Sequence, residues 1–139
     1  MKSINFDDRV LFYDGVCAMC NKLVLFLLKR DKKELIFFMS LHSPQAKTKL
    51  AHYGISYSSE APDTIYYLTK NRVYSHSDAI LKVCTDIGYL TILFKIAGII
   101  PLFIRNELYT WIAKNRYTWF GKSQTCSLLT LEERKRILD

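Results

Sequence analysis

Short apolar runs alternate with amphipathic segments in the first part of the chain. Residues 9–13 and 35–39 form largely apolar runs of strand length, which predicts two buried strands. Between them, apolar residues recur at helical spacing opposite a polar side, which predicts a helix over about residues 17–31. A helix that joins two buried strands indicates a right-handed β-α-β unit with parallel strands. The apolar side comprises Cys20, Leu23, Val24, Leu27 and Leu28, and the polar side Asn21, Lys22, Lys29 and Arg30.

A cap and a stop signal delimit a second helix. Ser43 is a favourable N-cap residue, and Pro44 suits the first helical position because its fixed backbone angle is already helical. Gly54 is typical of a helix end, so we predict a helix over about residues 44–53. The serine-rich residues 55–61 that follow predict a loop.

A hairpin and a third helix follow. The apolar segments 64–68 and 73–74 flank a polar turn, which indicates a β-hairpin. Ser77 is predicted to cap a helix that ends near Gly88. The apolar residues of this helix are Ile80, Leu81, Val83 and Cys84.

The last third of the chain contains no segment with a strand pattern. We predict helices over about residues 90–97 and 104–117, and a short helix over 131–138. The stretch 87–104 is the most membrane-like, but Lys95 and the interrupting glycines and proline argue against a membrane span. We interpret it as buried helices, with contact at a membrane surface as the alternative. The helix predicted over about residues 104–117 contributes to one apolar stripe, formed by Ile104, Leu108, Trp111, Ile112 and Trp119.

The composition favours one packed domain. A chain of 139 residues, half of them apolar and 24% charged, can bury a core without disulfide bonds. Neither a repeat nor a linker divides it, so we predict a single domain over residues 1–139, with a helical extension over about 89–139. Residues 1–9 lack the apolar core of a signal peptide, which predicts a cytoplasmic protein. In that reducing compartment, four cysteines indicate catalysis, metal binding or core packing rather than structural disulfides.

The formal net charge of +7 is unevenly distributed. Residues 22–49 contain seven basic and two acidic side chains, a balance that attracts anionic partners. No aromatic interleaving or nucleic-acid motif accompanies these charges, so we interpret them as a solvated helix surface and predict no nucleic-acid partner.

A Cys-x-x-Cys pair follows the first predicted strand. Cys17 lies at the predicted helix N-terminus, where unpaired N–H groups and the helix dipole stabilise a thiolate, so it is the candidate nucleophile. Cys20 lies one turn deeper on the apolar side, shielded from solvent, and is the candidate resolving thiol. The spacing therefore predicts sequential attack and resolution in thiol-disulfide exchange.

Asp14 is the third candidate catalytic residue. Its carboxylate is placed to accept the proton of Cys20 or to orient a water molecule. The same negative charge disfavours a thiolate at Cys17, so the two effects oppose each other. The alternative interpretation is that Asp14 only holds the turn through its backbone.

Zinc binding is the alternative chemistry for the pair. Cys-x-x-Cys supplies half of a tetrahedral zinc site, but no second close-spaced ligand pair accompanies it, so we predict no metal. The remaining ligands would have to come from Cys126, His42, His52 or His76. Cys84, within an apolar helix, is predicted to be a core residue. Cys126 follows a polar segment and is either a thiol that exchanges with the pair or an inert one.

The chain resembles the DCC family of thioredoxin-like proteins, named for the Asp-x-x-Cys-x-x-Cys signature present here as Asp14, Cys17 and Cys20. The resemblance implies an α/β, thioredoxin-like fold, with a central mixed sheet of about four strands flanked by helices and extra C-terminal helices. It also implies thiol-disulfide oxidoreductase activity on substrates that the family leaves undefined. Further matching segments are Tyr13-Asp14-Gly15, Ser77-Asp78-Ala79-Ile80, Tyr109, Asn115-Arg116-Tyr117, Phe120-Gly121 and Cys126.

The chain departs from ordinary thioredoxins near the pair. Ala18 and Met19 replace the usual Gly-Pro between the cysteines, and the first predicted strand lacks the buried acid of thioredoxins. Thioredoxin-like folds usually place a cis proline before the third strand, facing the cysteines. Here the candidates for that substrate-binding position are Pro62, Asp63 and Thr64.

A second resemblance concerns Ser77 and Asp78, which look like the glutathione-binding helix start of glutathione transferases and glutaredoxins. A serine hydroxyl and free N–H groups at a helix N-terminus can bind a carboxylate. The resemblance implies glutathione as a co-substrate, whereas the alternative is that Ser77 is only an N-cap.

The leading hypothesis is a dithiol-disulfide oxidoreductase without a bound cofactor. It predicts as partners a protein or small-molecule disulfide and an unidentified reductant. The alternatives are a glutathione-binding transferase or glutaredoxin-like protein, and a non-catalytic thioredoxin-like module that binds a protein or a membrane surface.

Overall fold

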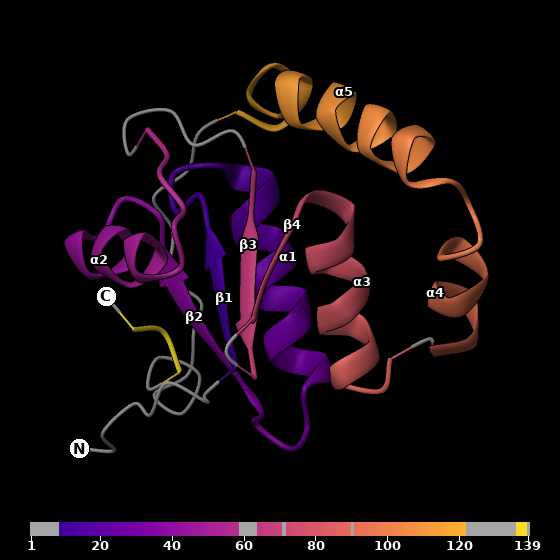
Figure 1. Cartoon of the computed structure of the whole chain (residues 1–139), viewed down its shortest axis with the longest axis horizontal. Coiled ribbons are helices and arrows are strands. Elements are labelled where there is room, and N and C mark those ends of the chain that lie inside the picture. Colours follow the sequence, from indigo (N-terminus) through magenta and orange to yellow (C-terminus); the bar gives the residue numbers. More distant parts are fainter. Residues whose placement is uncertain (1–8, 59–63, 71, 90, 122–135, 139) are drawn as a thin grey trace.

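A four-stranded mixed sheet forms the centre of the structure, a computed structural model that describes residues 9–58, 64–70, 72–89, 91–121 and 136–138. Its strands lie in the order β2-β1-β3-β4 (Figure 1). β1 is parallel to β2 and antiparallel to β3, and β3 forms a hairpin with β4. The β-α-β unit, the hairpin and the thioredoxin-like α/β fold are therefore confirmed. The strands are β1 (Arg9–Tyr13), β2 (Ile36–Ser40), β3 (Tyr66–Thr69) and β4 (Arg72–Ser75).

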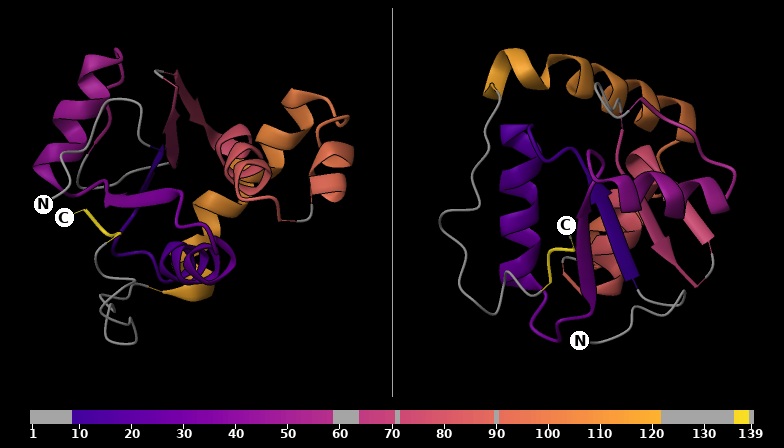
Figure 2. Two further views of the ribbon diagram at one scale, coloured as in Figure 1. Left: turned by 90° about the horizontal axis from the view of Figure 1, so that it is seen from below. Right: turned by 90° about the vertical axis from the view of Figure 1, so that its left-hand side faces the viewer.

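Helices cover both faces of the sheet (Figures 1 and 2). α1 (Ala18–Arg30) and α3 (His76–Asp86) lie on one face, and α2 (Pro44–His52) lies on the other. β1 contributes to both cores because successive side chains of a strand point to opposite faces. Leu11 and Tyr13 are buried in the cluster that includes α1 and α3, whereas Val10 and Phe12 are buried against α2.

The start of α3 differs from the sequence prediction. Ser75 occupies the N-cap position, so Ser77 lies within the first turn and the prediction that it caps this helix is wrong. The reason is that α3 follows directly on the last residue of β4, with His76 at a φ of 54° making the sharp change of direction. In α2, by contrast, Ser43 and Pro44 take the predicted N-cap and first-turn positions.

Two further helices follow, α4 (Thr91–Ala97) and α5 (Leu102–Phe120), as predicted. α5 crosses the N-terminal end of α1 and contacts α1 and α3, and α4 contacts α3 (Figures 1 and 2). The prediction that residues 87–104 form buried helices is wrong, because Ile92, Ile99 and Phe103 are 77, 81 and 70% exposed. Within the described part of the chain, α4 packs against α3 and α5 packs against α1 and α3, and these contacts leave many of their apolar side chains exposed. None of the described helices combines the length and apolar character needed to cross a membrane.

The C-terminal end of the chain lies beside β2. The N–H of Phe38 donates to the carbonyl of Arg136, and the N–H of Leu138 donates to the carbonyl of Phe38, at 2.8 and 2.6 Å. Residues 136–138 are therefore extended along the strand rather than helical, which contradicts the predicted helix over 131–138 for these three residues. Residues 131–135 lie outside the described part of the chain.

Candidate active site

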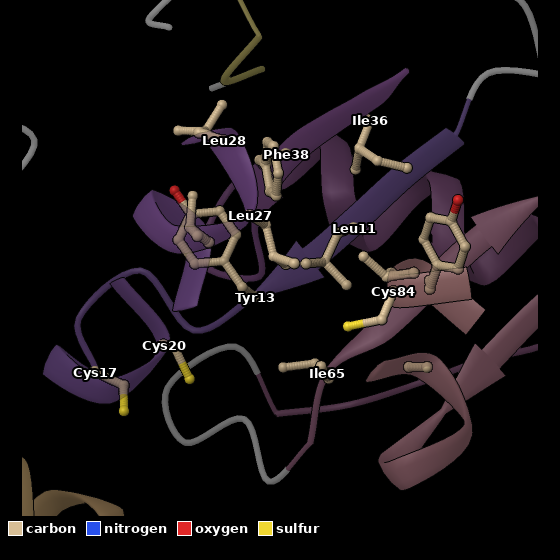
Figure 3. Close-up of a cluster of buried hydrophobic side chains, with 14 residues drawn as sticks. Leu11, Tyr13, Cys17, Cys20, Leu27, Leu28, Ile36, Phe38, Ile65 and Cys84 are labelled. Atoms are coloured by element: carbon tan, nitrogen blue, oxygen red, sulfur yellow. The ribbon is translucent and has the colours of Figure 1, made fainter. Parts of the chain in front are cut away.

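The Cys-x-x-Cys pair lies where β1 passes into α1. The N–H of Cys17 donates to the carbonyl of Asp14 at 3.2 Å and closes a turn directly after β1. Cys17 has extended backbone angles and is the N-cap residue, and its carbonyl accepts the first helical hydrogen bond, from Asn21, at 2.9 Å. Figure 3 shows the sulfur atoms of Cys17 and Cys20 on the same side of this first turn. The predicted placement of the pair at a helix N-terminus is therefore found.

The turn before the pair is tightly packed. A Cβ atom on Gly15 would lie 2.6 Å from Oγ of Ser40, so the end of β2 leaves room only for glycine. The side-chain amide of Asn21 donates to the carbonyl of Gly15 at 3.0 Å. Asn21 is consequently buried, and its assignment to the polar side of α1 is wrong because a turn carbonyl inside the fold requires a donor.

The two thiols have opposite pKa shifts. The thiol of Cys20 donates a hydrogen bond to the sulfur of Cys17, and this bond outweighs burial, lowering the pKa of Cys17 to about 6. The backbone N–H groups of Met19 and Cys20 and the positive charge of Arg116 lower it further. The same bond and burial raise the pKa of Cys20. At neutral pH, Cys17 is thus the thiolate and Cys20 the protonated partner.

The side chains of Cys17 and Cys20 are both buried. From the sequence, burial was predicted for Cys20 alone. Cys17 is 0% exposed and Cys20 is 4% exposed, and both belong to the apolar cluster on the α1 side of the sheet (Figure 3). The N–H of Ala18 also donates to the carbonyl of Gly121, just after α5, at 3.2 Å. A substrate disulfide therefore reaches Cys17 only when neighbouring groups move aside.

Asp14 is a buried carboxylate with donors from three parts of the chain. The N–H of Val16 donates to its Oδ1 at 3.1 Å, and Nε2 of His42 lies 2.7 Å from the same oxygen. Nη2 of Arg116 lies 3.2 Å from Oδ2, which also accepts a hydrogen bond from the hydroxyl of Tyr117. Burial alone would raise the pKa of Asp14, but the hydrogen bonds and the Arg116 charge together lower it. The Asp14 carboxylate thus joins its own turn to His42 and to α5, beyond the backbone contact that closes the turn.

Asp14 and Arg116 act on the thiols with opposite signs. The Asp14 charge raises the pKa of Cys20, and the Arg116 charge lowers the pKa of both Cys17 and Cys20. The ion pair between them joins α5 to the turn that carries the cysteines. The catalytic role predicted for Asp14 stays a prediction; the structure shows its ion pair with Arg116.

Several residues near the pair were not assigned a role from the sequence. His42 entered only as an alternative zinc ligand, although it follows β2 and faces Asp14. Arg116, Tyr117 and Tyr109 entered only through the family resemblance. The hydroxyl of Tyr109 accepts a hydrogen bond from the N–H of Ile65 at 3.1 Å, and Tyr109 packs against the apolar cluster that contains both cysteines, so α5 lines the site. The sequence offered one signal for these residues: the charged Arg116 and the polar tyrosines stand within a mostly apolar C-terminal helix.

Three of the five predicted substrate-binding residues, Thr64, Ser77 and Asp78, belong to the described part of the chain. Thr64 is buried, and its hydroxyl lies 3.1 Å from that of Tyr109 and accepts a hydrogen bond from the N–H of His76. Ser77 donates to Oδ1 of Asn106 at 2.8 Å, and Asp78 forms an ion pair with Arg105 at 2.9 Å, so both are bonded to α5. Pro62 and Asp63 lie outside the described residues. A substrate-binding role for all five stays a prediction.

The other candidate thiols and metal ligands form no second reactive site or metal site within the described part of the chain. Cys84 is buried in the core on α3, where burial raises its pKa to about 11. Within the ranges that the structure describes, no three His, Cys, Asp or Glu side chains are arranged to hold a metal ion. Cys126 lies outside those ranges.

The low pKa of Cys17 gives a direct spectroscopic prediction. The ultraviolet absorbance of thiolate in the reduced protein should rise with pH through an inflection near pH 6, because Cys17 is a thiol below its pKa and a thiolate above it. Arg116→Gln should move the inflection to higher pH, since it removes a positive charge. Cys17→Ser should lack the inflection. An inflection of the native protein near the ordinary cysteine pKa would contradict the prediction.

Comparison with known proteins agrees with this geometry. A family model described as DCC1-like thiol-disulfide oxidoreductase matches residues 11–122. The uncharacterized protein YuxK of Bacillus subtilis is 37% identical over 138 residues, which cover 99% of each chain. The chloroplastic DCC family protein At1g52590 of Arabidopsis thaliana is 34% identical over 124 residues, covering 86% of this chain and 69% of that protein. No solved structure matches the chain significantly.

Proposed function

The chain belongs to the DCC1-like thiol-disulfide oxidoreductase family, and from this premise we propose that it is an enzyme that exchanges disulfides through Cys17 and Cys20. The observation that carries the proposal is the pairing of a thiolate at a helix N-terminus with a protonated thiol one turn deeper. These two protonation states suit a nucleophile and a resolving group. The thiolate attacks the substrate disulfide, and the protonated thiol reacts only after the mixed disulfide has formed.

The proposed reaction has two exchange steps. The Cys17 thiolate attacks one sulfur of the substrate disulfide, forms a mixed disulfide and releases the other substrate sulfur as a thiolate, which takes up a proton. Cys20 then loses its proton and attacks the Cys17 sulfur, which forms the Cys17–Cys20 disulfide and releases the second substrate thiolate. The substrate gains two electrons and the pair loses two, so a dithiol or equivalent reductant must restore the pair.

Arg116 supports this sequence from α5. Its charge lowers the pKa of both thiols, so it favours the attacking thiolate of Cys17 and the deprotonation of Cys20 in the second step. Asp14 holds Arg116 in place through the buried ion pair. Asp14 is in this proposal a positioning residue, and its negative charge keeps Cys20 protonated until the mixed disulfide forms.

The substrate is a protein or small-molecule disulfide, and glutathione is the second candidate partner. The side chains of Ser77 and Asp78, on which glutathione binding would depend, are bonded to Asn106 and Arg105. Glutathione bound through these two side chains would therefore have to displace these contacts, in addition to the movement that any disulfide needs to reach Cys17. The recycling reductant and the cytoplasmic location stay predictions from the sequence.

A redox titration tests the proposed function. The protein is equilibrated in defined ratios of reduced and oxidised dithiol, free thiols are alkylated, and each cysteine is quantified by mass spectrometry. We expect Cys17 and Cys20 to lose alkylation together and reversibly as one two-electron couple, because they form one disulfide. Cys84 provides the internal reference and should remain a thiol throughout, since it is buried in the core. Failure to form a Cys17–Cys20 disulfide at any ratio would exclude the proposed mechanism.

A further inference from the structure

The helices that follow α3 expose an extensive apolar surface. Its side chains are between 44 and 81% exposed, although aliphatic and aromatic residues of this size are normally buried. Large apolar side chains that are exposed together on neighbouring elements usually mark a contact with a partner or a lipid surface. We name it the α4–α5 apolar surface, comprising Ile92, Leu93, Ile96, Ile99, Ile100, Leu102, Phe103, Ile104, Leu108 and Trp111.

The position of this surface separates it from the cysteine pair. α4 and α5 form the outer edge of the structure, on the opposite side from α2 (Figures 1 and 2). Tyr109 and Arg116 extend from α5 into the fold, whereas Phe103 and Trp111 are 70 and 57% exposed. One helix thus has a buried side that serves the redox site and an exposed apolar side that packing within the fold does not explain.

Charge around the surface favours an anionic partner. Residues 88–121 contain four basic residues, Lys95, Arg105, Lys114 and Arg116, and one acidic residue, Glu107. Arg105 and Arg116 form ion pairs with carboxylates of the fold, whereas Lys95, Lys114 and Glu107 are exposed, which leaves the basic side chains in excess. The whole chain carries a formal charge of +7, so a negatively charged surface would attract it.

The aromatic residues of α5 indicate which anionic surface this is. Trp111 and Trp119, the two tryptophans of the chain, are both half-exposed on α5, with ring centroids 5.0 Å apart. Tryptophan side chains favour the boundary between lipid headgroups and acyl chains, and aliphatic side chains enter the outer acyl region. An exposed, acid-poor helix pair with this composition matches an in-plane membrane contact, and no described helix is long and apolar enough to span.

We propose that the α4–α5 apolar surface binds in the plane of a lipid bilayer that contains anionic headgroups. The aliphatic residues and Phe103 enter the headgroup boundary, and Lys95 and Lys114 lie near the lipid charges. This inference is independent of the redox chemistry, since it uses none of the cysteine geometry.

Vesicle binding by the full chain tests the proposal. The protein is sedimented with large vesicles of phosphatidylcholine alone, or of equimolar phosphatidylcholine and phosphatidylglycerol. We expect binding to the anionic vesicles, weakened by high salt, with a blue shift of tryptophan emission, because Trp111 and Trp119 report from α5 itself. The variant Ile99→Asn/Phe103→Asn keeps the net charge and should bind about tenfold or more weakly, because it removes two exposed apolar side chains that would be buried in the bilayer.

A matched control variant separates the contact from general effects. Ala51→Asn places the same polar side chain at an exposed position of α2, away from the proposed surface, and should bind like the native protein. Circular dichroism should give the same helix content for all three proteins, since the replaced residues are exposed. Absence of sedimentation with anionic vesicles at millimolar lipid, or native-like binding by the double variant, would overturn the proposal. A dimer that dissociates in the double variant, without vesicle binding, would instead assign the surface to a second copy of the chain.

Discussion

Replacing Cys17 by serine should reduce the rate of disulfide reduction by roughly a thousandfold or more, to the level of the reductant alone. The thiolate is the attacking species, and a serine hydroxyl does not ionise near neutral pH or form a disulfide. The site stabilises negative charge at this one sulfur, through hydrogen bonds from Cys20 and Met19 and the charge of Arg116. The measurement is turnover of a small chromogenic disulfide with excess dithiol reductant.

Cys20→Ser should have a different effect. Cys17 retains its backbone donors and Arg116, so the first exchange still occurs, but the pair has lost the second thiol that would resolve the product. We expect a mixed disulfide between Cys17 and the substrate to accumulate, detectable as a mass increase of the intact protein that reductant removes. Cys84→Ser is the matched control because it makes the same atomic change at a buried cysteine outside the pair, and turnover should remain near native. Undiminished turnover of Cys17→Ser would refute the assigned nucleophile.

Replacing Arg136 by methionine should lower the free energy of unfolding by about 3–5 kcal/mol, a large share of the roughly 5–15 kcal/mol of an ordinary domain. Arg136 and Asp31 form a buried ion pair, with side chains 8 and 1% exposed. Arg136 also donates to the carbonyl of Ile36, and the same oxygen of Asp31 accepts the N–H of Ile36 at 2.8 Å. Methionine keeps much of the side-chain volume but leaves a buried carboxylate without its cationic partner.

A double-mutant cycle separates the ion pair from the rest of the contact. Arg136→Met and Asp31→Asn are measured singly and together by urea unfolding, and the double variant should be clearly more stable than the sum of the single effects predicts. The reason is that most of the cost lies in the unpaired charge, which the asparagine removes. A loss below about 1 kcal/mol for Arg136→Met would show that the C-terminal residues contribute little to stability. Lys33→Met, at an exposed position near the start of β2, is the control and should have little effect.

The periodicity of apolar residues was sufficient to predict the framework. β1, β2 and α1 were predicted within about one residue of their observed bounds, because their apolar patterns reflect burial directly. The parallel pairing of β1 and β2 followed from the helix between them. Errors occurred where a side chain finds a partner outside its own element. Asn21 is polar but buried because the carbonyl of Gly15 requires a donor.

The same patterns misjudged the last third of the chain. An apolar segment was taken as buried, but among the described residues the contacts of α4 with α3 and of α5 with α1 and α3 leave Ile99 and Phe103 exposed. Hydrophobicity reports that a side chain avoids water, and it does not distinguish a core of the same chain from an external surface. The segment at residues 136–138 was misassigned for a related reason, since its conformation depends on Asp31 and β2 rather than on local spacing.

The sequence alone determined the placement of the Cys-x-x-Cys pair, because three local features suffice for it: a buried strand, a turn at Gly15 and a helix with Cys17 at its N-cap. Their spacing along the chain places the first thiol at the helix N-terminus, where the helix dipole acts on it, and places the second thiol one turn deeper. Only the tertiary structure decided the electrostatic surroundings. Asp14 meets Arg116, 102 residues away, when α5 crosses the start of α1, and the pattern of neighbouring residues carries no information on such a contact. The chemistry of the pair is thus local, whereas the charges that adjust its two pKa values depend on the completed fold.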